Sequence, residues 1–222
     1  MALNAAEEET LDSLKQWWDE NGKGLVAMVI VVLASYTGWL LWQNNQTATA
    51  NAASDLYQEI LTIAVGGDGV PNPDADSARI RALADELRAD YSSTTYAQFG
   101  ALFAAQQAVA EDDLDAAEDY LRWVLENQQD GLFSDVDEGM ILTTNLRLGR
   151  VILAQGDTEG ALSLVNSVDP KTFEAGYAEL RGDIYVAMGR DVDARESYIA
   201  AQQAGSNSQA LRMKLDNLGS ES

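Results

Sequence analysis

The side chains that could do chemistry in this sequence are its carboxylates, because the chain contains neither cysteine nor histidine. That composition excludes disulfides, thiol catalysis, zinc sites of the Cys/His type, haem ligation by histidine and triads with a histidine base. Paired carboxylates could still serve a glycosidase. The candidate clusters are Asp112, Asp113 and Asp115; Asp135, Asp137 and Glu138; and Asp191 and Asp193.

These clusters are better explained by local structure than by catalysis. All of them lie in predicted turns or at predicted helix starts, where an aspartate caps free backbone N–H groups and interacts favourably with the helix dipole. With 36 acidic residues in the chain, some proximity is also expected by chance. We therefore predict that the protein is not an enzyme and holds no cofactor and no metal ion.

The net charge is −22, and −18 of it falls after Trp42, where 30 acidic residues stand against 12 basic ones. Such a surface repels nucleic acid and anionic lipid headgroups, so we expect no nucleic-acid partner. The segment after Trp42 is long enough for one domain with a sizeable core. Abundant alanine and leucine with only three prolines favour helices.

The elements that would position these residues start from an apolar stretch, Gly24 to Trp42, which has no charge over 19 residues. As a helix it would be about 28 Å long, close to the roughly 30 Å of a hydrocarbon core. A buried core helix would not need tryptophans at both ends, and a cleaved signal peptide would have a shorter apolar core. We predict an uncleaved signal anchor that Trp17 and Trp18 precede and that Tyr36, Trp39 and Trp42 close.

The orientation of this anchor follows from lysine and arginine, because acidic residues contribute little to membrane topology. Lys15 and Lys23 precede the apolar stretch, and the next basic residue after it is Arg79. This bias predicts a cytoplasmic N-terminus and a periplasmic C-terminal domain, if the source is a Gram-negative bacterium. The expected parts are a short cytoplasmic segment (1–23) punctuated by Asn21-Gly22, a transmembrane helix (24–42), a polar stalk (43–51) and a helical domain (52–218).

The region after the stalk contains an internal repeat. An offset of 33 relates Gly149 to Gly182, Gly156 to Gly189 and Ala161 to Ala194. A looser copy ends at Ala117, 44 residues before Ala161, which predicts an insertion near residues 131–138. This pattern is typical of tetratricopeptide (TPR) helix pairs, whose period is about 34 residues. The alternative is a plain helical bundle with chance spacing.

The small residues have expected tasks in such pairs. Gly149 and Gly182 would let the two helices of a pair approach closely, and the alanines at 117, 161 and 194 would lie at the crossings. Gly156 and Gly189 would end the first helix in a left-handed cap. Helices over 52–65 and 74–89, joined by a loop at 66–73, and a last helix over 209–218 would complete the stack. We predict an all-α protein: a single N-terminal transmembrane helix followed by a TPR-like α-solenoid domain.

A binding groove is expected on the inner face of this stack, which the first helix of each pair lines in TPR arrays. Its main character would be apolar, which suits an extended polypeptide, although Leu102, Leu146 and Leu153 could equally be ordinary core. A second candidate surface is the anchor, where Ala34 and Gly38 form a small-xxx-small pair that allows close helix packing in lipid or arises by chance. The predicted groove residues are Phe99, Leu102, Gln106, Val109, Leu146, Arg150, Leu153, Asp183 and Val186.

Several stretches, taken in order along the chain, resemble a known family. They are Glu20-Asn-Gly-Lys23, Gly38-Trp39 with Trp42, Asn145-Leu-Arg-Leu-Gly-Arg-Val151, Leu180-Arg-Gly182 with Gly189, Ala194-Arg195 and Met213-Lys-Leu-Asp-Asn-Leu218. The chain resembles the YfgM family, the ancillary SecYEG translocon subunits of Gram-negative bacteria. No single motif is diagnostic, but their order and spacing in a single-anchor TPR protein carry the resemblance.

The resemblance implies a single-pass inner-membrane protein beside the SecYEG channel. Its implied partners are the membrane-anchored chaperone PpiD and unfolded exported polypeptides, which it would help to hand over to periplasmic chaperones. It also implies a link between the cytoplasmic segment and envelope-stress signalling. The alternative function is a structural TPR scaffold for another envelope assembly, such as cell-wall or outer-membrane assembly.

The first testable prediction concerns topology. Alkaline phosphatase fused after Ser222 is expected to be active, because Lys15 and Lys23 precede the single apolar helix and retain the N-terminus in the cytoplasm. A reporter that works only in the cytoplasm should be silent at the same position. The reverse pattern of reporter activities would overturn the predicted orientation.

Overall fold

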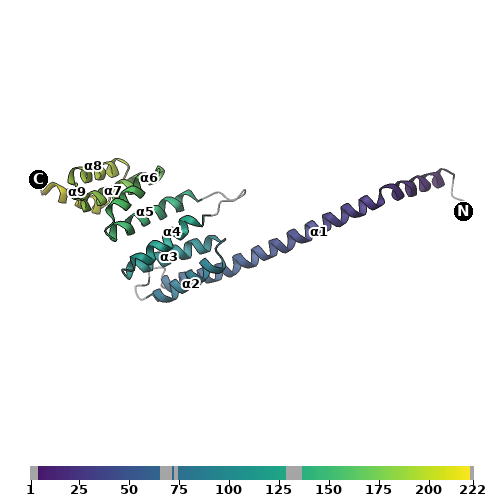
Figure 1. Ribbon diagram of the computed structural model, residues 1–222, viewed down its shortest axis with the longest axis horizontal. Helices are drawn as coiled ribbons and strands as arrows, with labels where there is room; N and C mark the ends of the chain where they lie inside the picture. The colour runs from purple at the N-terminus through teal and green to yellow at the C-terminus, as the bar shows by residue number, and fades with distance from the viewer. Residues whose placement is uncertain (1–4, 66–71, 73–74, 129–136, 221–222) are drawn as a thin grey trace. The chain divides into compact units, whose positions relative to one another are not determined.

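The computed structural model describes residues 5–65, 72, 75–128 and 137–220, and the regular elements within them are helices (Figure 1). The all-α prediction is therefore confirmed. The chain divides into two compact units, residues 1–51 and 52–222. The elements are α1 (Ala5–Ala64), α2 (Ser77–Asp90), α3 (Thr95–Ala110), α4 (Leu114–Glu126), α5 (Glu138–Ala154), α6 (Thr158–Ser167), the 3-10 turn η1 (Lys171–Phe173), α7 (Glu174–Ala187), α8 (Asp191–Gln203) and α9 (Gln209–Ser220).

The first unit is the N-terminal part of α1, which contains a stretch long and apolar enough to cross a membrane. Its large apolar side chains are exposed along their length, as a lipid-facing helix requires. One expectation was wrong: the helix does not break at Asn21-Gly22. The side-chain amide of Asn21 donates to the carbonyl oxygen of Trp17 at 3.1 Å. A lone glycine costs a helix only about 1 kcal/mol, which its helical neighbours tolerate.

The polar segment 43–51 is also helical, so the predicted helix over 52–65 is the end of α1 and not a separate element. No glycine or proline interrupts residues 43–65. The hydroxyl of Thr47 donates to the carbonyl oxygen of Gln43 at 3.0 Å, a bond that the helical backbone permits. The second unit begins at Ala52, and Ala53, Ile60 and Ala64 contribute to its core.

In the second unit, consecutive helices from α2 to α9 pack against one another (Figure 1). Aspartates start several of them, as the sequence predicts: Asp113 accepts a hydrogen bond from the backbone N–H of Ala116 at 3.2 Å, and Asp137 accepts one from Met140 at 2.9 Å. The expected pairs are α3 with α4, α5 with α6 and α7 with α8. Asp113 and Asp137 therefore cap helices, and Asp191 and Asp193 lie in the first turn of α8, as predicted. Asp135 lies outside the described residues.

The small residues at the helix crossings are buried, with Ala117, Ala161 and Ala194 all 0% exposed. A Cβ atom on Gly182 would lie 2.3 Å from Cδ1 of Tyr198 on the paired helix α8, so this close approach is confirmed. Gly149 differs in part, because its tightest neighbour is not on α6. Its Cβ would lie 2.9 Å from Leu180 of α7, in the next pair, and 3.6 Å from Val165 of α6.

Left-handed residues end the first helix of each pair. Gly156 has a φ of +90° and Gly189 a φ of +70°, which confirms both predicted caps. The equivalent position after α3 is Asp112, with a φ of 62°. Glycine adopts this conformation without a Cβ penalty, whereas an aspartate there is tolerated at some cost.

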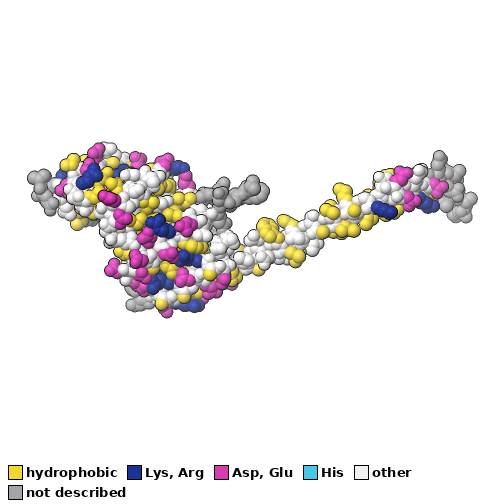
Figure 2. Space-filling view, in the orientation of Figure 1, with side chains coloured by type: hydrophobic (Ala, Val, Ile, Leu, Met, Phe, Trp, Pro, Cys, Tyr) yellow, Lys and Arg dark blue, Asp and Glu magenta, His cyan; other side chains and the backbone are white. Residues whose placement is uncertain are grey.

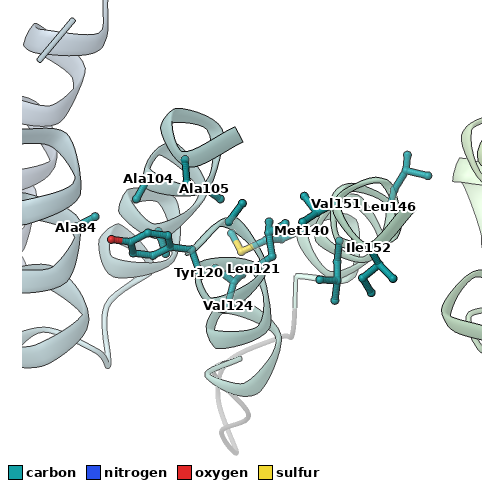
Figure 3. Close-up of a cluster of buried hydrophobic side chains, with 14 of the residues drawn as sticks. Ala84, Ala104, Ala105, Tyr120, Leu121, Val124, Met140, Leu146, Val151 and Ile152 are labelled. Atoms are coloured by element: carbon teal, nitrogen blue, oxygen red, sulfur yellow. The ribbon is translucent and has the colours of Figure 1, made fainter. Parts of the chain in front are cut away.

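The core runs continuously from α1 to α7, and a smaller cluster joins α7, α8 and α9. Figure 3 shows Leu121 and Val124 of α4 lying between α3 and α5, while the ring of Tyr120 points towards Ala84 of α2. Leu211 of α9 is 0% exposed, consistent with the predicted last helix. The predicted loop at 66–73 and the predicted insertion near 131–138 lie outside the described residues, apart from Asn72, Asp137 and Glu138.

Replacing Gly182 with leucine is expected to lower the free energy of unfolding by about 1–3 kcal/mol, because the new side chain overpacks the contact with Tyr198. The matched control is Ala187→Leu, which adds the same side chain at an exposed position of the same helix. Denaturant unfolding of the full chain in detergent, followed by circular dichroism, measures both. Equal unfolding midpoints for the two variants would contradict the close approach.

Replacing Asp112 with glycine is expected to raise the free energy of unfolding by up to about 1 kcal/mol. Removing the Cβ relieves the steric cost of the left-handed conformation and so stabilises the folded state. The greater conformational entropy of glycine in the unfolded chain offsets part of this gain. Its neighbour Glu111, with a φ of −92°, supplies the control, since Glu111→Gly should only destabilise. A loss of stability with Asp112→Gly, measured by the same unfolding experiment, would argue against the left-handed cap.

Candidate functional site

A pocket of about 440 Å³ lies between α3, α4 and α5. Ligand pockets commonly have volumes of about 300–1,000 Å³, so this one can take one or two peptide side chains. Most of its lining is apolar, with a glutamine and two arginines added. The lining residues are Leu102, Ala105, Gln106, Val109, Leu114, Leu121, Arg147, Arg150, Val151 and Ala154.

Helical periodicity brings these residues to one place. On α3, Leu102, Gln106 and Val109 recur at the spacing of one helix face, while the alanines on the opposite face are buried in the core. On α5, Arg147 and Arg150 are three residues apart and so lie on the same face. Leu121 of α4 is only 1% exposed and forms part of the apolar floor.

The charge of the pocket is opposite to that of the domain. Arg147 and Arg150 are exposed, and among the residues that the structure describes no aspartate or glutamate lines the pocket with them. Several other arginines are neutralised: Arg81 lies 2.8 Å from Asp113 and Arg88 lies 3.0 Å from Asp119. Figure 2 shows basic side chains scattered among acidic ones on the visible face of the domain. The pocket is therefore a small cationic, apolar site on an acidic protein.

The acidic cluster at the start of α4 has its own partners. Asp113 accepts a hydrogen bond from Arg81 and another from the backbone N–H of Ala116, and both lower the pKa of its carboxyl group. Asp115 accepts a hydrogen bond from the side chain of Gln155 at 3.1 Å. These carboxylates stabilise the fold and do not converge on the pocket.

Of the nine predicted groove residues, the pocket brings together Leu102, Gln106, Val109 and Arg150. Phe99 is 37% exposed but lies against the ring of Tyr57, with ring centroids 5.9 Å apart. It therefore belongs to an aromatic cluster at the junction of α1 and α3, not to the pocket lining.

The other predicted residues lie elsewhere. Leu146 is only 9% exposed, and Figure 3 shows it on the side of α5 away from Leu121, where it packs towards Gly176 of α7. Leu153 is half-buried against the same core. These two leucines take the core role that the sequence left open. Neither offers its side chain to the pocket.

On α7, the carboxylate of Asp183 accepts a hydrogen bond from the hydroxyl of Tyr198 at 2.8 Å and lies 2.7 Å from the Lys214 ammonium. Burial raises the pKa of Tyr198, and the hydrogen bond to Asp183 raises it further, so the hydroxyl remains a donor. Asp183 thus ties together α7, α8 and α9. Val186 is 43% exposed but does not line the pocket.

The sequence reasoning missed Arg147, which is the second charged residue of the pocket. Its spacing of three from Arg150 was a usable signal, because such residues share a helix face. Helix packing through Ala34 and Gly38 of the anchor remains a prediction. A Cβ on Gly38 would have nothing within 4 Å, so the surface around it is open.

The chain is similar to a known protein family. The family model described as a tetratricopeptide repeat-like domain matches residues 15–220. An ancillary SecYEG translocon subunit of Haemophilus influenzae is 33% identical over 98% of this chain and 100% of its own length. The proteins of the same name from Neisseria gonorrhoeae and Escherichia coli are each 28% identical, over 98% of this chain and 100% and 99% of their own lengths. No solved structure matches the chain.

The family model and the relatives agree with the architecture. The repeat-like match covers the stacked helices, and the apolar part of α1 fits a single-pass inner-membrane protein. With full-length coverage and an identity above 30% to one relative, the evolutionary relationship is clear. The chain belongs to the family of ancillary SecYEG translocon subunits, and it carries a tetratricopeptide repeat-like domain.

Proposed function

We propose that this protein is a non-enzymatic ancillary subunit of the SecYEG translocon that transiently holds segments of exported polypeptides. The translocon assignment comes from the relatives, which are named ancillary SecYEG translocon subunits. We extend this association from the relatives to this chain. The observation that carries the holding function is the pocket between α3, α4 and α5. Its apolar lining and open position suit short stretches of an unfolded chain.

The proposed arrangement follows the charge bias around the anchor. Residues 24–42 cross the inner membrane, Lys15 and Lys23 keep the N-terminus in the cytoplasm, and residues 52–218 form the periplasmic domain. In this arrangement, a polypeptide leaving the channel would bind this domain and pass from it to a PpiD-like chaperone. Binding must be weak for such a transfer; a micromolar dissociation constant corresponds to about −8 kcal/mol.

The acidity of the domain suits this role. With 30 acidic residues against 12 basic ones after Trp42, copies of the domain repel one another. This repulsion discourages self-association through exposed apolar side chains. The pocket thus remains open to other chains. The proposal also assigns Ala34 and Gly38 of the anchor to packing against membrane helices of the channel.

A photocrosslinking experiment tests the holding function. A photoreactive amino acid replaces Val109, which lines the pocket and is 47% exposed, in cells that export a precursor stalled in the channel. The expected result is a crosslink to the precursor. Val192 of α8, which is 82% exposed and outside the pocket, supplies the matched control and should give little product. Equal products at both positions would contradict holding in the pocket.

The same cells test the translocon assignment. Purification of the full chain in mild detergent should recover SecYEG subunits and a PpiD-like chaperone. Recovery of cell-wall or outer-membrane assembly proteins instead would favour a structural scaffold.

Repeating the purification with Ala34→Ile and Gly38→Ile asks whether the anchor contributes to channel association. Loss of the channel subunits would support the helix contact, and unchanged recovery would place the contact in the rest of the chain.

A further inference from the structure

Within the described part of the chain, the pocket between α3, α4 and α5 has two charged lining residues, Arg147 and Arg150, and both carry the minority charge of the domain. Its other polar lining side chain is Gln106. Any charge on a bound segment therefore meets a local field of sign opposite to that of the domain. This local field can give the pocket a charge preference that the net charge of the chain would not suggest.

Neither arginine forms an ion pair with any residue that the structure describes, although both are exposed and acids are abundant. Like charges one turn apart on a helix destabilise it by a few tenths of a kcal/mol. The helix dipole does not compensate, because neither arginine lies in the last turn of α5. An anion bound between them would relieve this repulsion.

We propose that the pocket selects segments in which an aspartate or glutamate side chain lies next to large apolar side chains. A guanidinium group binds a carboxylate through two parallel hydrogen bonds, which gives geometric specificity as well as attraction. Leu102, Leu121 and Val151 supply apolar surface beside the two arginines. This inference rests on the proposed function and names the class of segment that the pocket holds.

The preference runs against the long-range electrostatics of the domain. A charge of −18 attracts cationic segments at a distance, but salt screens such attraction beyond about 8 Å at physiological ionic strength. In contact with the pocket, the two arginines repel a lysine and attract a carboxylate. The net charge of the domain would rank cationic peptides first, whereas the two arginines of the pocket would rank acidic peptides first. Affinities for a series of peptides that differ only in charge therefore show which effect dominates.

The test uses the full chain in detergent and four fluorescent peptides, with binding followed by anisotropy. Three are blocked at both ends and share the core Leu-Phe-X-Leu, where X is Glu, Gln or Lys. The fourth is the Gln peptide with a free C-terminal carboxylate. The Glu peptide is expected to bind about three- to tenfold more tightly than the Gln peptide, and the Lys peptide most weakly. The advantage should shrink in 0.5 M salt, because exposed charges are screened.

Variants assign the effect to the pocket. Arg147→Gln with Arg150→Gln should abolish the advantage of the Glu peptide. Arg195→Gln with Arg212→Gln removes the same charge from exposed positions on α8 and α9 and should preserve it. Ala154→Trp fills the pocket from an exposed position that lines it, and should weaken binding of all four peptides.

The outcomes separate the inference from the proposed function. Tightest binding of the Lys peptide, or equal binding of the Glu and Gln peptides, overturns the charge preference. If Ala154→Trp still weakens binding in that case, holding in the pocket stands. Tightest binding of the peptide with a free terminus would assign the arginines to chain ends and overturn the choice of an internal segment. If neither Ala154→Trp nor the double Arg147/Arg150 variant changes peptide binding, the pocket is not the binding site. That result would overturn both the charge preference and the proposed holding in the pocket.

Discussion

The close approach of consecutive helices is the constraint on which the rest of the domain depends. At Gly182, the backbone of α7 comes so near the ring of Tyr198 that a Cβ would lie 2.3 Å from it. The same tyrosine donates to Asp183, and Lys214 of α9 binds that carboxylate from the next helix along the chain. One contact therefore sets the spacing of a helix pair and also joins it to the last helix. Stacking at this spacing buries the alanines and leaves large side chains to fill the gaps.

Basic residues are scarce in the domain, and most of them pair with acidic neighbours. Acidic residues exceed basic ones by more than two to one after Trp42, and most cations are neutralised by neighbouring carboxylates, as in the pairs of Arg81 with Asp113 and Arg190 with Asp193. Many of the acids also have structural roles, because they cap helices. Arg147 and Arg150 are among the described arginines that form no ion pair with a described residue, and these two lie together beside apolar surface. The site is therefore marked by two unpaired arginines that share one apolar pocket.

Apolar side chains have two different roles in the two units. In the anchor, residues such as Ile30 and Trp42 are 60% exposed along a helix with the length and composition of a membrane span. In the second unit, side chains of the same kinds, such as Ile60 and Leu121, are almost fully buried between helices. Because lipid replaces helix neighbours as the apolar environment in the first case, exposure there is no sign of a protein interface.

Local features of this protein were determined by its sequence. The helices, the aspartate caps of α4 and α5, the left-handed glycines at 156 and 189 and the apolar anchor depend on residues within one or two turns. The break expected at Asn21-Gly22 failed because one glycine does not outweigh a long helix. The pocket depended on tertiary structure: the 33-residue repeat indicated which helices line the inner face, but not how each is rotated. Successive helical residues point about 100° apart, so packing against α7 buries Leu146 while its neighbour Arg147 reaches the pocket.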